Sequence, residues 1–279
     1  MKLGVCEVQG RKILAEIDGD TIYGLAWPDS NMAGLIRRGI TPTRTYERFA
    51  LGNVRLRAPI HPGKIIAVGK NYAEHAKEVG GSLPERPLLF AKLSSAVVGD
   101  GEAITWRTSL TTEVDWEVEL GVVIGKTAKD VPEDKALDYV FGYTVANDVS
   151  ARDIQTRIDS QWTRGKGLDT FCPLGPCIVT RDEIADPQNL WLKTTVNGEV
   201  MQDGRTNDMV FGVRQLIAYI TRNITLEPGD LIITGTPSGV GMGMNPPRFL
   251  KQGDVVTVSV EGVGEISNSC EVIDDAADS

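Results

Sequence analysis

Four acidic residues stand at every second position of the stretch TTEVDWEVELGVVIGK, which covers residues 111–126. They are Glu113, Asp115, Glu117 and Glu119, and apolar residues fill the positions between them. A period of two is typical of a β-strand, so the pattern directs all four carboxylates to one face. Carboxylates two apart on a strand lie roughly 7 Å from each other, and at an effective dielectric of ~20 each pair repels by about 2 kcal/mol.

A solvated strand face is one interpretation of these acids, and a metal site is the other. Two features favour the metal site. The acids lead into the apolar run 121–124, where an uncompensated carboxylate is costly, and Asp148 ends another apolar stretch. Two carboxylates from one strand and one from a neighbouring strand end would form an all-oxygen site, which selects Mg²⁺, Mn²⁺ or Ca²⁺ over zinc.

Two further segments contain residues that could transfer protons or stabilise charge. His75 and Glu78 are three residues apart and share a helical face. They form either a chance surface pair or a dyad in which the carboxylate orients the imidazole to accept a proton from water. This helix, stopped by Gly80-Gly81, could close over a site as a lid. Lys166 lies in a glycine-flanked loop, where lysines are usually solvated; near the acids it would offset their charge and stabilise an oxyanion.

The segment TGTPSGVGMG, residues 234–243, is rich in glycine. It lacks the spacing and the Lys-Ser/Thr pair of a P-loop, and it lacks the spacing of a dinucleotide fingerprint. Its backbone N–H groups and the Thr236 hydroxyl would suit a carboxylate. The alternative interpretation is an ordinary loop at the end of a strand.

Composition narrows the class of partner and the cellular compartment. The net charge of -9 argues against nucleic acid or an anionic membrane surface as the main partner. An anionic small substrate stays compatible, because a bound cation inverts the local charge. Four cysteines without a Cys-x-x-Cys pair, and two histidines, predict no zinc site and suit a reducing compartment. No apolar run resembles a membrane span or a signal peptide, so we expect a cytoplasmic protein.

The elements expected around these residues are mostly strands. We expect hairpins at Asp18-Gly19 and Asn197-Gly198, and strands at 117–125 and 139–147. The pattern lacks βαβ alternation, which favours a strand-rich α+β fold. The segment 57–64 contains two prolines and a glycine. It therefore predicts a boundary between a small β-rich module, residues 1–58, and a main domain, residues 59–279.

Two helices are predicted in the second half of the chain. Ser150 stands at a candidate N-cap position with Asp153 three residues later, which is the spacing of a capping box. The segment 208–221 has apolar residues at helical spacing along one stripe, which predicts an amphipathic helix packed on the core.

Taken together, these segments resemble the fumarylacetoacetate hydrolase family. The resemblance lies in the pieces VGKNYAEHAKE, FAK, DWEVELGVVIG, GYTVANDVSARDIQ, RGKGLDTFCPLGP, NGEVMQ, PGDLIITGTPSGVG and FLKQGD, which follow the family's order over about residues 60–270. Residues 1–58 resemble the small N-terminal domain of bacterial members. The resemblance implies a strand-rich roll with a few short helices and a site at its mouth, generally in a homodimer.

The same resemblance assigns roles to single residues. Metal ligands for one Mg²⁺ or Mn²⁺ per subunit, with Ca²⁺ as a substitute, are Glu117, Glu119 and Asp148. Matches to the lid dyad and the active-site lysine are His75, Glu78 and Lys166. Substrate-contacting positions are Arg152, Gln155, Gly235 and Thr236. Glu113 and Asp115 are then expected to form a solvated approach. Cys172 and Cys177 depart from the family pattern near Lys166, which leaves the pocket shape open.

The resemblance also implies the chemistry. A small anionic 2-oxo acid would chelate the metal, which acts as a Lewis acid, and breaking the bond at C3 would leave an enolate that the metal and Lys166 stabilise. The leading expectation is a hydrolase of 2,4-dioxo acids of the acylpyruvate or fumarylpyruvate type, in which His75 and Glu78 activate water. The alternatives are an oxaloacetate decarboxylase, a 2-hydroxyhepta-2,4-diene-1,7-dioate isomerase and, more remotely, a non-catalytic binding or scaffold protein.

Overall fold

The computed structural model describes residues 1–78, 80 and 82–273. The strands are β1 (Lys2–Val8), β2 (Arg11–Asp18), β3 (Thr21–Leu25), β4 (Arg44–Ala50), β5 (Arg55–Arg57), β6 (Ile65–Gly69), β7 (Leu88–Lys92), β8 (Val97–Val98), β9 (Ile104–Arg107), β10 (Val114–Asp115), β11 (Val118–Ile124), β12 (Val140–Asn147), β13 (Ser150–Ala151), β14 (Cys172–Thr180), β15 (Trp191–Val196), β16 (Glu199–Arg205), β17 (Leu231–Ile233), β18 (Val255–Val260) and β19 (Gly264–Ile273). The α-helices are α1 (Met32–Arg38), α2 (Ala73–Glu78), α3 (Trp162–Lys166) and α4 (Val213–Thr221). The prediction of a strand-rich α+β fold with a few short helices is confirmed.

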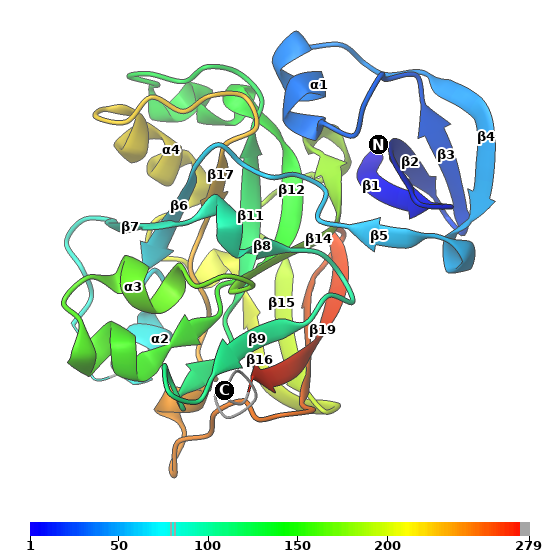
Figure 1. Ribbon diagram of the computed structural model, residues 1–279. Helices are drawn as coiled ribbons and strands as arrows, with labels where there is room; N and C mark the ends of the chain where they lie inside the picture. The colour runs from blue at the N-terminus through cyan, green and yellow to red at the C-terminus, as the bar shows by residue number, and fades with distance from the viewer. Residues whose placement is uncertain (79, 81, 274–279) are drawn as a thin grey trace.

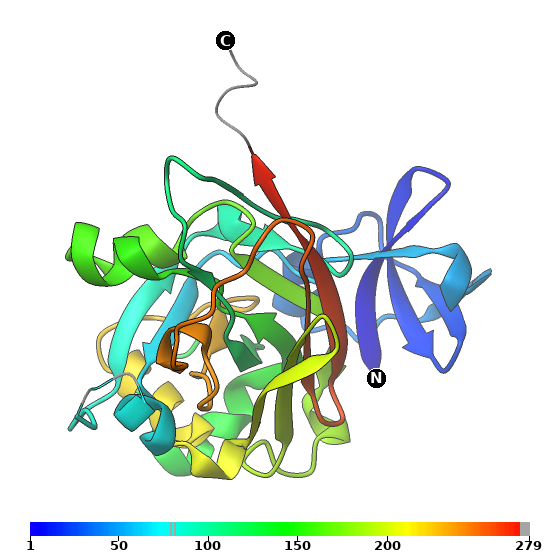
Figure 2. The same cartoon turned by 90° about the horizontal axis from the view of Figure 1, so that it is seen from below.

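These strands form one large sheet, one smaller sheet and a separate two-stranded pair. The large sheet runs in the order β4-β3-β2-β1-β14-β12-β11-β17-β6-β7, with β5 paired to β1 and β8 paired to β14. The second sheet has the order β16-β15-β18-β19-β9, and β10 pairs with β13 alone. In Figure 2, β19 (red) lies between the N-terminal strands (blue) and the helices of the rest of the chain (green and cyan). Among the described residues, none of the helices has the length and apolar character needed to cross a bilayer.

The first five strands and α1 form a group at one end of the molecule (Figure 1). This group is joined to the remainder through the antiparallel pairing of β1 with β14. Its residues Leu3 and Leu35 share a core cluster with Leu174 and Ile178 of β14. The sheet and part of the core therefore continue across residue 58, and the division into two domains there stays a prediction.

Strand β11 is buried on both faces, which explains its continuous apolar sequence. Leu120 and Val122 belong to a core cluster that also contains Val258 and Ile266 of the smaller sheet. Val123 belongs to the cluster that reaches the N-terminal strands. Successive side chains of a strand point to opposite faces, so β11 contributes to both clusters and holds its side chains between two packed layers.

The pairing of β11 with β12 positions three of the acidic residues. The antiparallel register aligns Val118 with Asn147. Asp148, the next residue, therefore lies level with Glu117, and its backbone amide donates to the Glu117 carbonyl oxygen over 2.9 Å. Glu119 lies two residues beyond Glu117 and shares its side of the chain. The predicted convergence of two strand acids with one from a neighbouring strand end follows from this register.

Both predicted hairpins are present. The turn at Asn197-Gly198 joins β15 to β16 with φ values of 53° and 82°. Such left-handed pairs suit the twist of a two-residue hairpin. The turn between β2 and β3 consists of Gly19 and Asp20, one residue later than expected. The expected strands at 117–125 and 139–147 correspond to β11 and β12 within two residues.

The helix expected at 208–221 begins later, at Val213 in α4. The Asn71 side chain holds the segment before it, since its amide donates to the Phe211 carbonyl and its oxygen accepts from the Phe211 N–H. The Gln215 side chain then accepts from the Gly212 N–H and caps the helix. The apolar stripe of α4 is core, as expected.

The prediction that Ser150 caps a helix is wrong. Ser150 lies in the short strand β13, opposite Asp115, and its hydroxyl donates to the Asp148 carbonyl over 2.8 Å. The helical stretch begins at Arg152 and continues as the π turn Ile154–Ile158. The Asp153 carboxylate accepts from the Ile154 N–H. The hydroxyl was free to bond backwards along the chain, so the capping spacing alone did not fix the start of the helix.

Candidate active site

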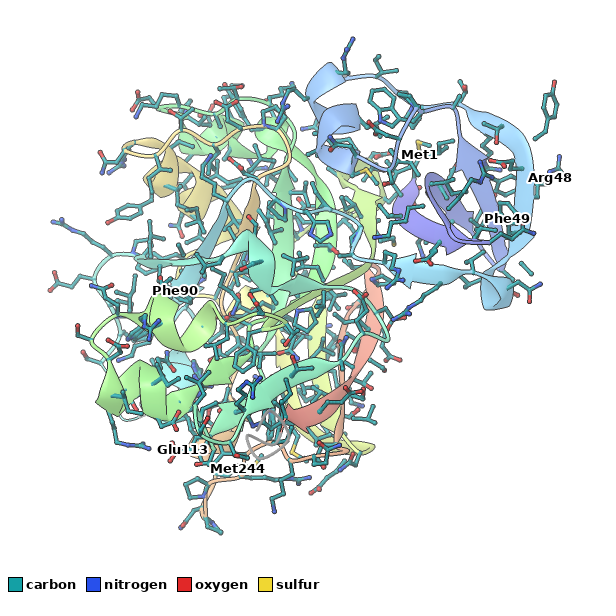
Figure 3. The ribbon with its side chains drawn as sticks, in the orientation of Figure 1. Met1, Arg48, Phe49, Phe90, Glu113 and Met244 are labelled. Carbon is teal, nitrogen blue, oxygen red and sulfur yellow. The ribbon has the colours of Figure 1, made fainter. Side chains whose placement is uncertain are left out.

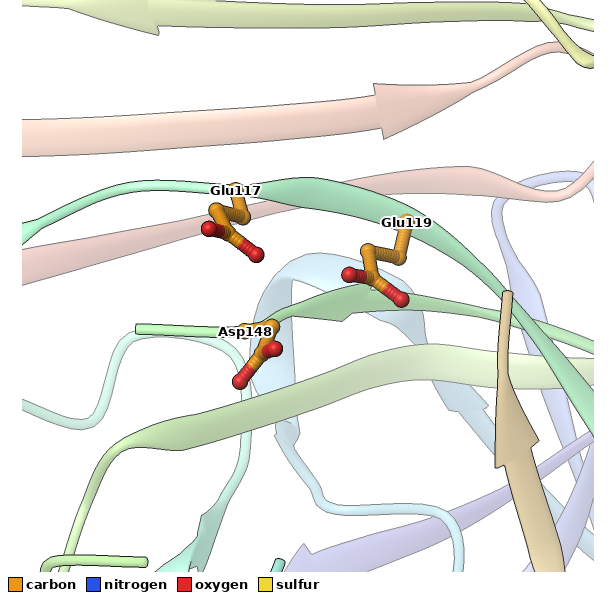
Figure 4. A group of neighbouring side chains, drawn as sticks. All are labelled: Glu117, Glu119 and Asp148. Atoms are coloured by element: carbon orange, nitrogen blue, oxygen red, sulfur yellow. The ribbon is translucent and has the colours of Figure 1, made fainter. Parts of the chain in front are cut away.

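Glu117, Glu119 and Asp148 form a compact group of carboxylates (Figure 4). Each offers an oxygen, and these oxygens all lie within 4.8 Å of one another. All three side chains are buried. At these distances, burial makes the mutual repulsion far more costly than on a solvated strand, so the group requires positive charge nearby.

Lys166 supplies part of that charge. Its Nζ lies 2.8 Å from Glu117 Oε2 and 2.7 Å from Asp148 Oδ2. Burial opposes the charged ammonium, but Asp148 and Glu117 outweigh it and raise the pKa of Lys166 above its ordinary value. The side chain is buried at the end of α3, not solvated in a loop. The structure therefore brings this lysine into contact with two of the three carboxylates.

Lys92, at the end of β7, is a second buried cation and was not assigned from the sequence. Its Nζ lies 2.6 Å from Asp148 Oδ1, and its side chain is fully buried. It also donates to the carbonyl oxygens of Val149, over 3.2 Å, and of Lys166. The signal that could have revealed it is a lysine that closes the otherwise apolar strand LLFAK.

The carboxylate group still has an excess of negative charge. Burial opposes the ionised form of Glu117, but Lys166 and Arg152 outweigh it and lower the pKa of Glu117 to about 2. For Glu119, burial together with Asp148 and Glu117 raises the pKa well above its usual range. The Gly235 N–H, 2.7 Å from Glu119 Oε2, offsets this only in part. A hard dication would complete the compensation, so an all-oxygen donor set of this kind fits Mg²⁺ or Mn²⁺.

Asp115 does not form a solvated approach, and that prediction is wrong. Its carboxylate is buried, and Oδ2 accepts from Arg152 Nε over 2.8 Å. It also accepts the backbone N–H groups of Gly241, over 2.7 Å, and Met242, over 3.0 Å. The chain leaves strand geometry between β10 and β11, so Asp115 and Glu117 do not continue one face. Glu113 matches the expectation better, since it is half-buried at the lower edge of the molecule in Figure 3.

Arg152 connects Asp115 to the carboxylate group. Its Nη1 lies 2.8 Å from Glu117 Oε1 and donates to Gln155 Oε1 over 3.0 Å. Within the described part of the chain, its Nη2 is buried and has no hydrogen-bond partner. A buried guanidinium nitrogen without a partner is a suitable donor to a carboxylate ligand.

The predicted dyad is present. Nδ1 of His75 lies 3.3 Å from Glu78 Oε2, and the imidazole is buried. The other Glu78 oxygen accepts from the Gly239 N–H over 2.9 Å. A Cβ at Gly243 would lie 2.3 Å from the Glu78 Cγ, so only glycine permits this approach. The glycine-rich segment thus holds the dyad.

Gly80 takes a left-handed φ of 71° after α2, and Gly81 lies outside the described residues.

The polar groups of Gly235 and Thr236 form hydrogen bonds mainly with other residues of the chain. The Thr236 hydroxyl accepts from Gln202 Nε2 over 2.7 Å. The N–H of Gly235 bonds a carboxylate, as expected of this segment, but the carboxylate is that of Glu119. Gln202 also accepts from the Val118 N–H over 3.0 Å. It therefore ties the glycine-rich segment to the start of β11.

A cavity of about 610 Å³, including its open mouth, lies over this group. It is lined by Val68, Gly69, Lys70, His75, Phe90, Glu117, Arg152, Gln155, Thr156, Trp162, Lys166, Thr236 and Met242. The predicted site residues outside this described lining are Glu78, Glu119, Asp148 and Gly235, each of which contacts a site residue. The cavity therefore combines a charged floor with an apolar wall that includes Phe90 and Trp162.

Cys172 and Cys177 do not belong to the described lining of this cavity. Both are buried in β14. Burial raises the pKa of the Cys172 thiol to about 12 and that of Cys177 to about 11. Both thiols are therefore neutral packing groups near neutral pH.

Comparison with known proteins places this site in a family. The family model for the fumarylacetoacetate (FAA) hydrolase C-terminal domain matches residues 64–271. The mitochondrial oxaloacetate tautomerase Fahd2a of Rattus norvegicus is 50% identical over 212 residues, which are 76% of this chain and 67% of the relative.

Two solved structures have the same fold over nearly the whole chain. A fumarylacetoacetate hydrolase from Exiguobacterium antarcticum is 39% identical with a TM-score of 0.86, and the match covers 98% of this chain and 100% of that one. A 5-carboxymethyl-2-hydroxymuconate delta-isomerase from Mycobacterium smegmatis is 39% identical with a TM-score of 0.82, over 98% and 100% of the two chains. The chain therefore belongs to the fumarylacetoacetate hydrolase family.

Proposed function

We propose that this protein is a metal-dependent hydrolase that cleaves a C–C bond in 2,4-dioxo acids of the acylpyruvate type. The observation that carries the proposal is the dyad at the cavity. His75 lines the same cavity as Glu117 and Lys166, and its Nδ1 lies 3.3 Å from the Glu78 carboxylate. A carboxylate at Nδ1 favours the proton there, which leaves Nε2 able to accept a proton from water.

The carboxylates would hold the metal, and the cations would hold the substrate. Glu117, Glu119 and Asp148 are the ligands for Mg²⁺ or Mn²⁺, which when bound supplies Lewis-acid polarisation of a substrate carbonyl. The unpartnered Nη2 of Arg152 donates to the substrate carboxylate. Lys166 donates to the oxygen on which negative charge develops.

The reaction balances with these groups and one water molecule. His75 accepts a proton from the water as its oxygen attacks the C4 carbonyl carbon of the substrate. The C3–C4 bond then breaks, and its electron pair forms the enolate of pyruvate while C4 becomes a carboxylic acid. The proton held by His75 returns to C3 and completes pyruvate. Glu78 stabilises the charged imidazole during this cycle.

The test is pyruvate release from acetylpyruvate and fumarylpyruvate in the presence of Mg²⁺ or Mn²⁺. EDTA is expected to abolish the release, and His75→Ala to lower kcat by about 10²–10⁴-fold. Lys77→Ala is the matched control, since Lys77 lies on the exposed side of the same helix, paired with Glu74. Full activity in the His75→Ala variant would rule out the activation of water by His75.

Oxaloacetate tautomerisation is the second candidate, favoured by the 50% identity to the rat tautomerase. It needs only proton transfer between C3 and the enol oxygen, and the same His75 could carry that proton. The assay is keto–enol equilibration of oxaloacetate, followed beside pyruvate and CO₂ release. Rapid equilibration without pyruvate release from either dioxo acid would replace the hydrolase proposal with this one, and CO₂ release would indicate the decarboxylase.

A further inference from the structure

Gln202, on β16, uses every hydrogen-bonding group of its side-chain amide. Its Oε1 accepts from the Val118 N–H over 3.0 Å and from the Thr194 hydroxyl over 2.8 Å. Its Nε2 donates to the Thr236 hydroxyl oxygen over 2.7 Å and to the Pro237 carbonyl oxygen over 2.8 Å. The side chain is fully buried. An amide has two donor hydrogens and two acceptor lone pairs, so none of its capacity is left for another partner.

Two of these neighbours fix the orientation of the amide. The backbone N–H of Val118 can only donate, so the atom next to it is the amide oxygen. The backbone carbonyl of Pro237 can only accept, so the atom next to it is the amide nitrogen. A flipped amide would place two donors together at one contact and two acceptors together at the other. One amide hydrogen is therefore committed to the Thr236 oxygen.

The consequence concerns the hydroxyl hydrogen of Thr236. Because the Thr236 oxygen accepts from Gln202, its own hydrogen must be donated to another group. Among the described residues, Thr236 forms no side-chain hydrogen bond in which it is the donor. Thr236 lines the cavity together with Arg152 and Lys166. An acceptor for this hydrogen is therefore expected from the contents of the cavity.

Close packing maintains the contact between Gln202 and Thr236. A Cβ at Gly239 would lie 2.0 Å from the Met201 carbonyl oxygen, and a Cβ at Gly204 would lie 2.5 Å from the Pro237 Cβ. Strand β16 therefore packs directly against the glycine-rich segment 234–243. The contact follows from the packing of these two segments.

We propose that Gln202 is a positioning residue that sets the hydrogen-bond polarity of the site. By occupying the Thr236 oxygen, it makes the Thr236 hydroxyl an obligate donor to the ligand. The site then favours a ligand oxygen that only accepts, such as that of a carboxylate or a ketone, over a group that itself donates. This inference rests on the proposed function only for the class of ligand, a 2-oxo acid.

The test is Gln202→Glu, which keeps the acceptor for Val118 and Thr194 and removes the amide donors. An ionised carboxylate at this position accepts from the Thr236 hydroxyl. A protonated one donates its single hydrogen to the Pro237 carbonyl and still accepts from Thr236. In both states the Thr236 hydroxyl donates to residue 202 and is lost to the ligand.

Calorimetry with oxalate on the Mg²⁺-loaded protein measures this loss without turnover, because oxalate has two adjacent acceptor oxygens, as a 2-oxo acid does. We expect Gln202→Glu and Thr236→Val each to raise the dissociation constant about 10- to 100-fold. Thr236→Ser keeps the hydroxyl and should bind within about threefold of the wild type. The matched control is Gln188→Glu, which should bind oxalate as the wild type does. Gln188 also joins a backbone N–H to a carbonyl but lies outside the described lining of the cavity.

Combining the substitutions distinguishes this coupling from a general structural role. If Gln202 acts through Thr236, Gln202→Glu in the Thr236→Val background adds no more than about threefold to the dissociation constant. Gln202→Met, which is neutral and of similar length, is a second variant with the same expected result. An equal loss in both backgrounds would overturn the inference.

Two further results would also overturn it. The Mg²⁺-induced rise in Tm should persist in Gln202→Glu, and its loss would show that Gln202 acts on the metal ligands beside Val118. Absence of oxalate binding to the wild type would contradict the inference even if the enzyme hydrolyses acylpyruvates. The coupling between Gln202 and Thr236 supports it even if the wild type releases no pyruvate.

Discussion

The N-terminal strands and the active site use ion pairs in opposite ways. Arg44, on β4, bridges Glu16 and Asp18 with 39% of its side chain exposed. Lys166 bridges Glu117 and Asp148 with 2% exposed. Solvent and salt screen the first pair, so it contributes little. The Lys166 pairs are desolvated. Removing one partner therefore leaves an uncompensated buried charge, even where the intact cluster adds no net stability. A charged residue of the N-terminal strands can therefore be substituted at little cost. Substitution of a charged residue in the site leaves its buried partners uncompensated.

The largest effect is expected from Asp115→Ala. It would leave the Arg152 guanidinium without its Nε partner and leave the Gly241 and Met242 N–H groups unpaired. We expect a loss of about 4 kcal/mol in the free energy of unfolding, measured with urea. Glu113→Ala, two residues earlier at the surface, is the control and should unfold nearly as the wild type does. Equal losses in both variants would show that burial does not distinguish these acids.

Lys92→Met comes next. It would remove the partner of Asp148 Oδ1 and cost about 3 kcal/mol without metal, because a buried carboxylate loses its cation. Added Mg²⁺ supplies positive charge to the same carboxylate. We therefore expect the Mg²⁺-induced rise in Tm to be larger in this variant than in the wild type, as measured by thermal unfolding. A smaller rise would show that Lys92 mainly positions the metal ligands and does not substitute for the positive charge of the metal.

Metal binding itself should give a somewhat smaller effect. Mg²⁺ or Mn²⁺ at a hundredfold excess over its dissociation constant stabilises a protein by about 2.7 kcal/mol. Glu119→Gln removes one of the three converging carboxylates, and we expect it to abolish the rise in Tm. Glu113→Gln, outside the group, should leave the rise intact. An unchanged rise in Glu119→Gln would place the ion elsewhere.

The smallest effect is expected from Arg44→Ala. The side chain is exposed, and its contacts with Glu16, Asp18 and the Tyr23 ring lie at the surface. Thermal unfolding should give a Tm within about 2 °C of the wild type, and 1 M salt should reduce the difference further. A drop as large as that of Asp115→Ala would contradict the contrast between the two regions.

Local signals in the sequence predicted the features that depend on neighbours along the chain. Asn197-Gly198 specifies its own hairpin, because the two left-handed residues suffice for the turn. The convergence of Glu117 and Glu119 with Asp148 followed from strand alternation and from the position of Asp148 at a strand end. The family resemblance was needed to select these acids from the others.

The errors lie where distant segments decide. Asp115 looked equivalent to Glu113, but the backbone N–H groups that bury it come from residues 241 and 242. Lys92 was passed over because its partner Asp148 follows β12, a strand that is not adjacent to β7 in the sheet. The alternation of residues within one strand contains no information on such partners. The role of a buried charged side chain can be assigned only when its partners are known.

The two-residue pairing of β1 with β14 has a consequence for the solubility of the chain. Lys2 and Leu3 lie opposite Val179 and Ile178, at the end of β14. Without the first strands, this end would present unpaired N–H and C=O groups next to exposed apolar side chains. Such an edge is a template for intermolecular strand addition. The N-terminal strands thus cover an edge that would otherwise favour aggregation. A fragment starting at residue 59 would need another cover for that edge.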